Sequence, residues 1–289
     1  MISVVICTYN RAEALKLCLE SFTHIDFAKP WELIVVDNNS SDATQKVIEK
    51  IQHSTDLPVR TVLEQKQGLG YARNRGLAES QYPIVAYTDD DCYPQADYLT
   101  QISKNFSEHD ISFVGGRVLL FDPTDLELTV QFSTETVFFE PTTYMRAGVI
   151  HGANFAFKRD LLIEANGFDP NLGAGSPFKA GEDTDLLAEC QRLGARGKYA
   201  PEIVVSHHHG RKSQEDFISL KHSYDIGRGA FYAKRLFFCS GGKLRTFKNW
   251  FFCIRNQPWS MTKTELKYAS RYTLQRLQNK LDYEPRNLA

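Results

Sequence analysis

The stretch SVVICTYNRAEALKLCLESF, residues 3–22, places an apolar run of strand length directly before an amphipathic helix pattern. In its second half, Leu15, Cys18, Leu19 and Phe22 recur at the spacing of one helix face. A strand followed by such a helix is one βα unit. Since parallel strands need crossover helices, repetition of this unit predicts a parallel sheet.

Three further βα units follow, each an apolar run of strand length and then a helical pattern. They are ELIVVD with SSDATQKVIEKI (residues 32–51), VRTVLEQ with YARNRGLAES (59–80), and PIVAYTD with QADYLTQISKNF (83–106). In an open parallel sheet, ligands bind outside the carboxyl ends of the strands. The loops that follow these four strands are therefore the candidate binding loops.

Composition limits the classes of protein to consider. A chain of 289 residues with 42% hydrophobic residues can bury a large core, and its formal charge of −1 gives no basic average for tracking nucleic acid. The six cysteines show no regular spacing, which argues against a disulfide framework or a zinc site. The start of the chain lacks a signal-peptide pattern, and no apolar run reaches the roughly 20 residues that span a bilayer. We expect a cytoplasmic protein with reduced thiols.

The first candidate loop, CTYNR, contains no glycine, which argues against a dinucleotide bound in the Rossmann manner. A bound mononucleotide remains an open alternative. Asp37, which closes the second strand, can accept hydrogen bonds from a base or ribose, while Arg73 and Arg75 offer guanidinium forks for a diphosphate.

The fourth candidate loop carries three consecutive carboxylates, Asp89, Asp90 and Asp91. Carboxylates packed side by side raise one another's pKa and need positive charge or water around them. Beside a diphosphate, Mg²⁺ or Mn²⁺ fits, because these hard cations combine carboxylate, water and phosphate oxygens.

In their order and spacing, these stretches resemble the family 2 glycosyltransferases of the GT-A fold. The matching stretches are VVICTYNR, IVVDNNSSDAT, GLGYARNRG, YTDDD as the D-x-D element, HGANFAFKRDLLIEANGFDPNLG, and AGEDTDLLAECQRLG as the E-D element. The resemblance extends from residue 1 to about residue 235. Any single stretch would be weak evidence for the family, and the specificity of the resemblance comes from the order and spacing of the whole series.

The resemblance implies a fold and a division of the chain. The expected fold is α/β of the GT-A nucleotide-diphospho-sugar transferase type, with a Rossmann-like, mainly parallel sheet flanked by helices. The catalytic domain would span residues 1–210, with a nucleotide-binding half to about residue 110 and an acceptor half after it. Residues 211–289 would form a mostly helical extension.

The resemblance also implies residue roles. Asp183 would be the general base that deprotonates the acceptor hydroxyl, supported by Glu182. Asp89 and Asp91 would be the two D-x-D carboxylates, one directed to ribose and one to a divalent metal, Mn²⁺ or Mg²⁺, with His207 as a further metal ligand. Donor contacts would come from Thr8, Tyr9, Arg11, Asp37, Asn39, Arg73, Asp89, Asp90 and Asn154.

Each motif also has a purely structural interpretation. Asp37 with the residues after it makes a good turn and helix cap, Arg73 is a possible solvated charge, GEDTDL suits a helix start, and TDDD suits an exposed loop. We favour the functional interpretation because the structural one needs several coincidences in the right order. For the run His207–His209, a metal ligand and a surface histidine run remain equally open, and His209 would share the face of His207.

The segment 228–263 is basic and aromatic, and no acidic residue lies between Asp225 and Glu265. Such a segment suits peripheral contact with the inner face of a membrane. It also suits a helix that packs its aromatics onto the catalytic domain, which we favour slightly because Phe and Trp are more often core residues.

The sequence thus predicts an inverting glycosyltransferase that moves a sugar from a nucleotide-diphosphate sugar, with UDP implied by the resemblance, to a glycan, lipid-linked or other hydroxyl acceptor. A sugar-phosphate nucleotidyltransferase is the first alternative, although the N-terminal loop lacks the glycines it needs. The second is a sugar-nucleotide-binding module without catalysis, which would not need Asp183. Nucleic acid is not an expected partner.

Overall fold

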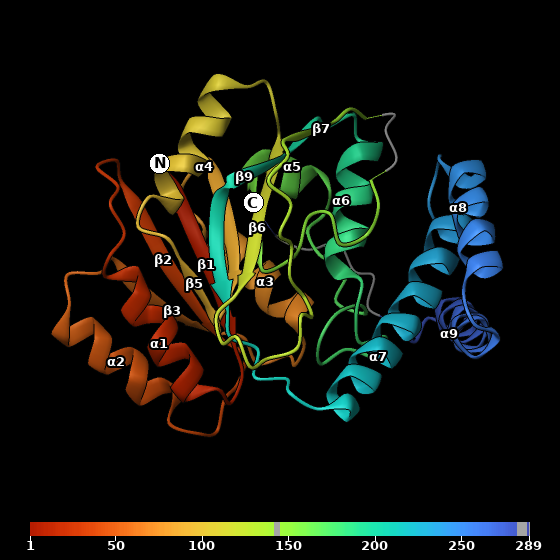
Figure 1. Ribbon diagram of the computed structural model, residues 1–289, viewed down its shortest axis with the longest axis horizontal. Helices are drawn as coiled ribbons and strands as arrows, with labels where there is room; N and C mark the ends of the chain where they lie inside the picture. The colour runs from red at the N-terminus through yellow and green to blue at the C-terminus, as the bar shows by residue number, and fades with distance from the viewer. Residues whose placement is uncertain (142–144, 282–287, 289) are drawn as a thin grey trace.

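The computed structural model describes residues 1–141, 145–281 and 288. Within these residues one mixed sheet runs in the order β3-β2-β1-β4-β8-β6-β9-β5, with β7 paired to β9 (Figure 1). The strands are β1 (Ile2–Thr8), β2 (Trp31–Asp37), β3 (Val59–Leu63), β4 (Ile84–Asp89), β5 (Cys92–Pro94), β6 (Phe113–Leu120), β7 (Val137–Phe139), β8 (Asn154–Lys158) and β9 (Gly197–His207).

Helices cover both faces of this sheet, and a further group lies at one side (Figure 1). They are α1 (Ala12–Phe22), α2 (Thr44–Ser54), α3 (Leu69–Glu79), α4 (Tyr98–Glu108), α5 (Arg159–Glu164), α6 (Glu182–Arg192), α7 (Gln214–Ala233), the π-helix η1 (Lys234–Phe238), α8 (Lys243–Asn256) and α9 (Trp259–Leu277). The predicted mainly parallel α/β fold with C-terminal helices is confirmed.

The two faces of the sheet follow from the period-2 alternation of its strands. Val4 and Ile6 of β1 pack in one core cluster with α1, α2 and α4, whereas Val5 packs in a second cluster with α3, α5 and α6. Because both faces are covered, β1 reads as a continuous apolar run.

Strand register decides which loops meet. The first four strands by position, β3-β2-β1-β4, are all parallel, as the four βα units predict. Thr8 pairs with Asp37 and Cys7 with Asp89, so the first, second and fourth candidate loops leave the sheet at one edge. The short strand β5 was not predicted, and its pairing with β9 brings Cys92 opposite His207.

The C-terminal helices are attached to the rest of the chain by a core of their own and by buried ion pairs. Lys234 of η1 lies 2.7 Å from Asp169 and 2.6 Å from Asp185 of α6, and Arg235 lies 2.6 Å from Glu189. The predicted division at residue 210 stays a prediction, and part of the extension, residues 282–287 and 289, lies outside the described residues. Across the described part of the chain, none of the helices is both long enough and apolar enough to cross a bilayer.

These ion pairs generate a first prediction. Lys234→Met should lower the free energy of unfolding by about 3–5 kcal/mol, because Asp169 and Asp185 would remain buried without their shared cation. Urea denaturation measures the change, and Lys46→Met, at an exposed site on α2, is the control with an expected change within about 0.5 kcal/mol. Equal effects of the two substitutions would contradict a stabilising role for the cluster.

Candidate active site

A cavity of about 430 Å³ opens at the carboxyl ends of β1 and β4. It gathers most of the predicted site residues from segments that are far apart in the sequence. These are Thr8, Tyr9, Arg11, Arg73, Asp89, Asp90, Asp91, Glu182, Asp183 and His207. The predicted loops after β1 and β4 and the E-D element therefore meet at one place.

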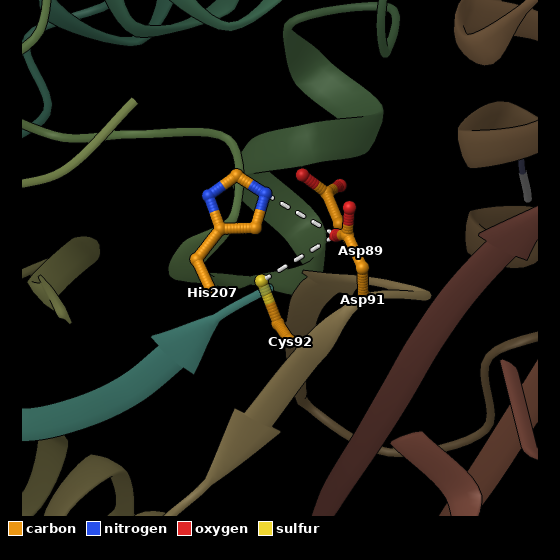
Figure 2. Close-up of side chains that lie close together, drawn as sticks. All are labelled: Asp89, Asp91, Cys92 and His207. Atoms are coloured by element: carbon orange, nitrogen blue, oxygen red, sulfur yellow. Dashed lines mark hydrogen bonds and ion pairs between the residues drawn. The ribbon is translucent and has the colours of Figure 1, made fainter. Parts of the chain in front are cut away.

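Asp91 is the centre of a tight polar cluster at the end of β4 (Figure 2). Its Oδ1 lies 3.2 Å from Nε2 of His207, and its Oδ2 accepts a hydrogen bond of 2.7 Å from Arg11. Asp91 and His207 are about 4% and 5% exposed, so the interpretations of TDDD as an exposed loop and of the histidines as a surface run are both wrong.

The protonation states in this cluster depend on each other. Burial alone would raise the pKa of Asp91, yet His207 and Arg11 hold it well below its usual range. Burial alone would lower the pKa of His207, yet the Asp91 carboxylate outweighs burial and raises it. Each side chain of the pair thus favours the charged form of the other.

Asp90, between the two D-x-D carboxylates, is bonded inside the protein. Its Oδ2 accepts from the Thr8 hydroxyl at 2.7 Å and its Oδ1 from Arg11 at 2.8 Å. Burial raises the pKa of Asp90 to about 7 in spite of the Arg11 guanidinium. The side chain bonds Thr8 and Arg11, and its predicted donor contact stays a prediction.

Arg73 of α3 connects the D-x-D and E-D elements. The side chain is buried, and its guanidinium lies 3.2 Å from Asp89 and 3.1 Å from Glu182. It also donates to the carbonyl of Gly152 and lies over the rings of Phe155 and Phe168. Both terminal nitrogens are engaged within the protein, so the solvated-charge interpretation is wrong.

The E-D element begins helix α6 after Gly181, which adopts φ +94°. Asp183 accepts from the backbone N–H of Gly152 at 3.2 Å through Oδ2 and from that of Thr184 at 2.6 Å through Oδ1. Burial and the neighbouring Asp183 raise the pKa of Glu182 to about 7, against the opposing effect of Arg73. Two carboxyl groups with different surroundings thus stand side by side at a helix start.

Three predicted donor contacts lie away from the cavity lining. Asp37 accepts from the Ser40 backbone N–H at 2.9 Å, as in the turn interpretation, and Asn39 is exposed. Asn154 has no exposed surface, and its amide donates to the carbonyls of Arg117 and Ile203. Asn154 therefore does not reach the cavity, and its predicted donor contact finds no support in this geometry.

Other residues line the cavity that sequence reasoning did not assign to the site. Asn38 accepts from Gly68 N–H at 2.8 Å and donates to two carbonyls of the loop before α3, so it joins two candidate loops. Further lining comes from His151, Lys179, Arg211 and Tyr224. Arg211 follows His207 by four residues in the same loop, and no spacing signal marks the others.

Of the remaining histidines, His209 lies beside His207, with ring centroids 5.2 Å apart. His208 bonds the Tyr93 hydroxyl at 3.0 Å, whereas Nε2 of His209 contacts the Leu126 carbonyl at 3.0 Å and Nδ1 lies 3.7 Å from Asp125. Neither lines the cavity. Of the three, His207 alone faces the D-x-D carboxylates.

A divalent metal fits the donor set of this cluster. Ligand atoms of Asp89, Asp91, Cys92 and His207 all lie within 4.8 Å of one another. Two carboxylates and one imidazole suit Mn²⁺ or Mg²⁺. Burial raises the pKa of the Cys92 thiol well above its usual value, and a sulfur ligand suits a hard cation poorly.

Comparison with known proteins gives the relationship of the chain. It is 27% identical over 229 residues to Glycosyltransferase AglE of Haloferax volcanii, across 79% of this chain and 72% of that protein. It is 25% identical to the Glucosyl-dolichyl phosphate glucuronosyltransferase of the same organism, across 71% and 68%.

Solved structures share the fold. The mannosyltransferase PcManGT of Pyrobaculum calidifontis, in complex with GDP-Man and Mn²⁺, superimposes with a TM-score of 0.59 at 18% identity, over 96% of this chain and 87% of that one. S. aureus TarS 1–349 in complex with UDP-GlcNAc gives 0.63 at 18%, over 85% and 69%. The model of the family described as Glycosyl transferase family 2 matches residues 3–165, more than half of the chain. The GT-A fold is thereby confirmed, and the chain belongs to glycosyl transferase family 2.

Proposed function

We propose that this glycosyltransferase transfers a sugar from a nucleotide-diphosphate sugar to an acceptor hydroxyl with inversion, and that Asp183 is the general base. The observation that carries the proposal is that one cavity is lined both by the D-x-D carboxylates and by Asp183, with Arg73 bonded to the two elements. A single displacement needs a base for the attacking alcohol and positive charge for the departing diphosphate.

The residues of the chain divide these tasks. Asp183 is held by the N–H groups of Gly152 and Thr184, which leave a carboxylate lone pair for the acceptor proton. Glu182 is held by Arg73, which also bonds Asp89 and so ties the E-D element to the D-x-D element. Asp89, Asp91 and His207 would hold the metal ion, which supplies positive charge to the leaving diphosphate.

Two further cations of the cavity support a diphosphate. Arg211 and Lys179 line it, and among the ion pairs between described residues neither side chain takes part in one. Arg11 and Arg73, by contrast, are already bound to carboxylates. We therefore assign Arg211 and Lys179 to the donor phosphates rather than Arg73.

The resemblance and the relatives suggest the donor base and the acceptor. The resemblance favours a uridine nucleotide, TarS was solved with UDP-GlcNAc, and PcManGT was solved with GDP-Man. A relative named for glucosyl-dolichyl phosphate supports a lipid-linked sugar as the acceptor, with a glycan as the second choice. All six thiols are free, which suits a reducing compartment, so we place the reaction in the cytoplasm.

A panel of UDP-, GDP- and dTDP-sugars incubated with Mn²⁺ tests the proposal. Release of the nucleoside diphosphate supports a transferase. Release of pyrophosphate from a nucleoside triphosphate and a sugar phosphate would instead indicate a nucleotidyltransferase, and binding without turnover would indicate a binding module. Mass spectrometry of the product then identifies the acceptor and linkage.

Asp183→Asn separates catalysis from binding. Transfer should fall by about 10²–10⁴-fold, because an amide cannot take the acceptor proton, while donor affinity stays within a few-fold. The transfer rate, donor affinity and melting temperature are measured beside Asp160→Asn, which alters an exposed carboxylate in the first turn of α5. A helix-capping role alone predicts an active Asp183→Asn enzyme, since Asn caps nearly as well as Asp.

Asp91→Asn addresses the metal site. The affinity for nucleoside diphosphate in the presence of Mn²⁺ should fall at least about tenfold, and the gain that Mn²⁺ gives the wild type should disappear. Titration calorimetry with and without Mn²⁺ measures both, with Asp110→Asn at an exposed site as the control. If the mutant keeps the metal dependence of the wild type, Asp91 is not a ligand.

A further inference from the structure

Helix α8 presents an exposed face that is both aromatic and basic. None of its residues is buried, and Leu244, Phe247, Phe251 and Phe252 are 68%, 56%, 51% and 67% exposed. The basic side chains Lys243, Lys248 and Arg255 are exposed beside them. At 100° per residue, these seven positions fall on one side of the helix. We call them the outer face of α8.

The side of α8 that carries Trp250, next to the outer face, attaches the helix to the molecule. Trp250 stacks on Tyr232 at 5.2 Å between ring centroids, and its indole N–H donates to Glu265 at 2.8 Å. In Figure 1, α8 lies at the side of the molecule away from β1, β2 and β3. The expectation that the aromatics pack the segment onto the protein is therefore right for Trp250 and wrong for the phenylalanines of the outer face.

Charge on this segment has one sign. No acidic residue occurs between Asp225 and Glu265 in the sequence, and these two are engaged by Arg228 and Trp250. A shallow hollow at the start of α8 is lined by the basic residues Lys243, Arg245 and Lys248. The apolar surface of the outer face thus lies beside Lys243, Lys248 and Arg255, none of which takes part in an ion pair between described residues.

We propose that the outer face of α8 binds the surface of a bilayer that contains anionic lipid. The Phe and Leu side chains would enter the boundary between headgroups and acyl chains, and the Lys and Arg side chains would meet lipid phosphates. This goes beyond glycosyl transfer, because the cavity that supports the reaction does not include α8.

Electrostatics favours a lipid surface over a second copy of the chain. A twofold dimer places the same patch on both partners, so Lys243, Lys248 and Arg255 would face their own copies without an acidic residue between them. Like charges brought together and desolvated oppose such an interface. An anionic membrane supplies opposite charge and an apolar layer at the depth that a helix lying in the interface needs.

The test is sedimentation of the full-length protein with vesicles. Binding should be strong with phosphatidylcholine–phosphatidylglycerol vesicles at low salt, weaker at high salt, and weak with phosphatidylcholine alone. Since each basic residue near an anionic surface contributes about fivefold, Lys243→Gln/Lys248→Gln/Arg255→Gln should lower the partition constant about a hundredfold. Phe247→Ser/Phe251→Ser should also reduce binding, and at high salt as well.

Matched controls are Lys46→Gln/Lys50→Gln on α2 and Leu17→Ser/Leu63→Ser, all at exposed positions elsewhere. They should bind vesicles like the wild type, and melting temperatures show that each variant is folded. Absence of binding at low salt, or equal losses in the controls, would overturn the proposal. So would a dimer in solution that Phe247→Ser/Phe251→Ser dissociates. Donor turnover without vesicles is measured separately, so failure here leaves the proposed reaction intact.

Discussion

Buried carboxylates at the end of β4 and the start of α6 can exist together only because two arginines lie among them. Taking a carboxylate out of water costs several kcal/mol unless a counter-charge and hydrogen bonds replace the water. Arg11 supplies both to Asp90 and Asp91, and Arg73 supplies both to Asp89 and Glu182. Each pairing joins segments that are distant in sequence, so the geometry of the cavity depends on the whole sheet being folded.

The compensation is incomplete, and this shapes what the cavity can bind. Five carboxyl groups, Asp89, Asp90, Asp91, Glu182 and Asp183, line the cavity, and the ion pairs of the described residues join them to Arg11, Arg73 and His207 alone. Burial raises the pKa of Asp90 and Glu182, both to about 7, in spite of the arginines beside them. A divalent cation held by Asp89, Asp91 and His207 would add positive charge both for these carboxylates and for a diphosphate beside them. The cavity suits a metal and an anion together better than either alone.

Sequence patterns predicted the part of the fold that local rules determine. The four βα units predicted that the first strands are parallel and that the loops after them lie at one edge of the sheet, whereas the order that makes β1 and β4 neighbours is known only from the structure. The contact of His207 with Asp91 depends on β5 pairing with β9, a non-local event that no local pattern encodes. The sequence also placed Asn39 rather than Asn38 at the site, because turn residues do not reveal which side chain points to the ligand. Asn154 bonds backbone carbonyls inside the sheet, which a motif position cannot show.

Basic side chains of the C-terminal helices have two different environments, one with acidic partners and one without them. Lys234 and Arg235 form ion pairs with Asp169, Asp185 and Glu189. These pairs neutralise both cations and attach η1 to α6. A few residues later, Lys243 and Lys248 have no acidic residue nearby in sequence, and exposed aromatics stand beside them. Exposed cations alone are ordinary, and exposed aromatics alone cost solubility. On one helix face, the cations keep the neighbouring aromatic side chains soluble in water. An anionic lipid surface would bury the aromatic side chains and supply counter-charge to the cations.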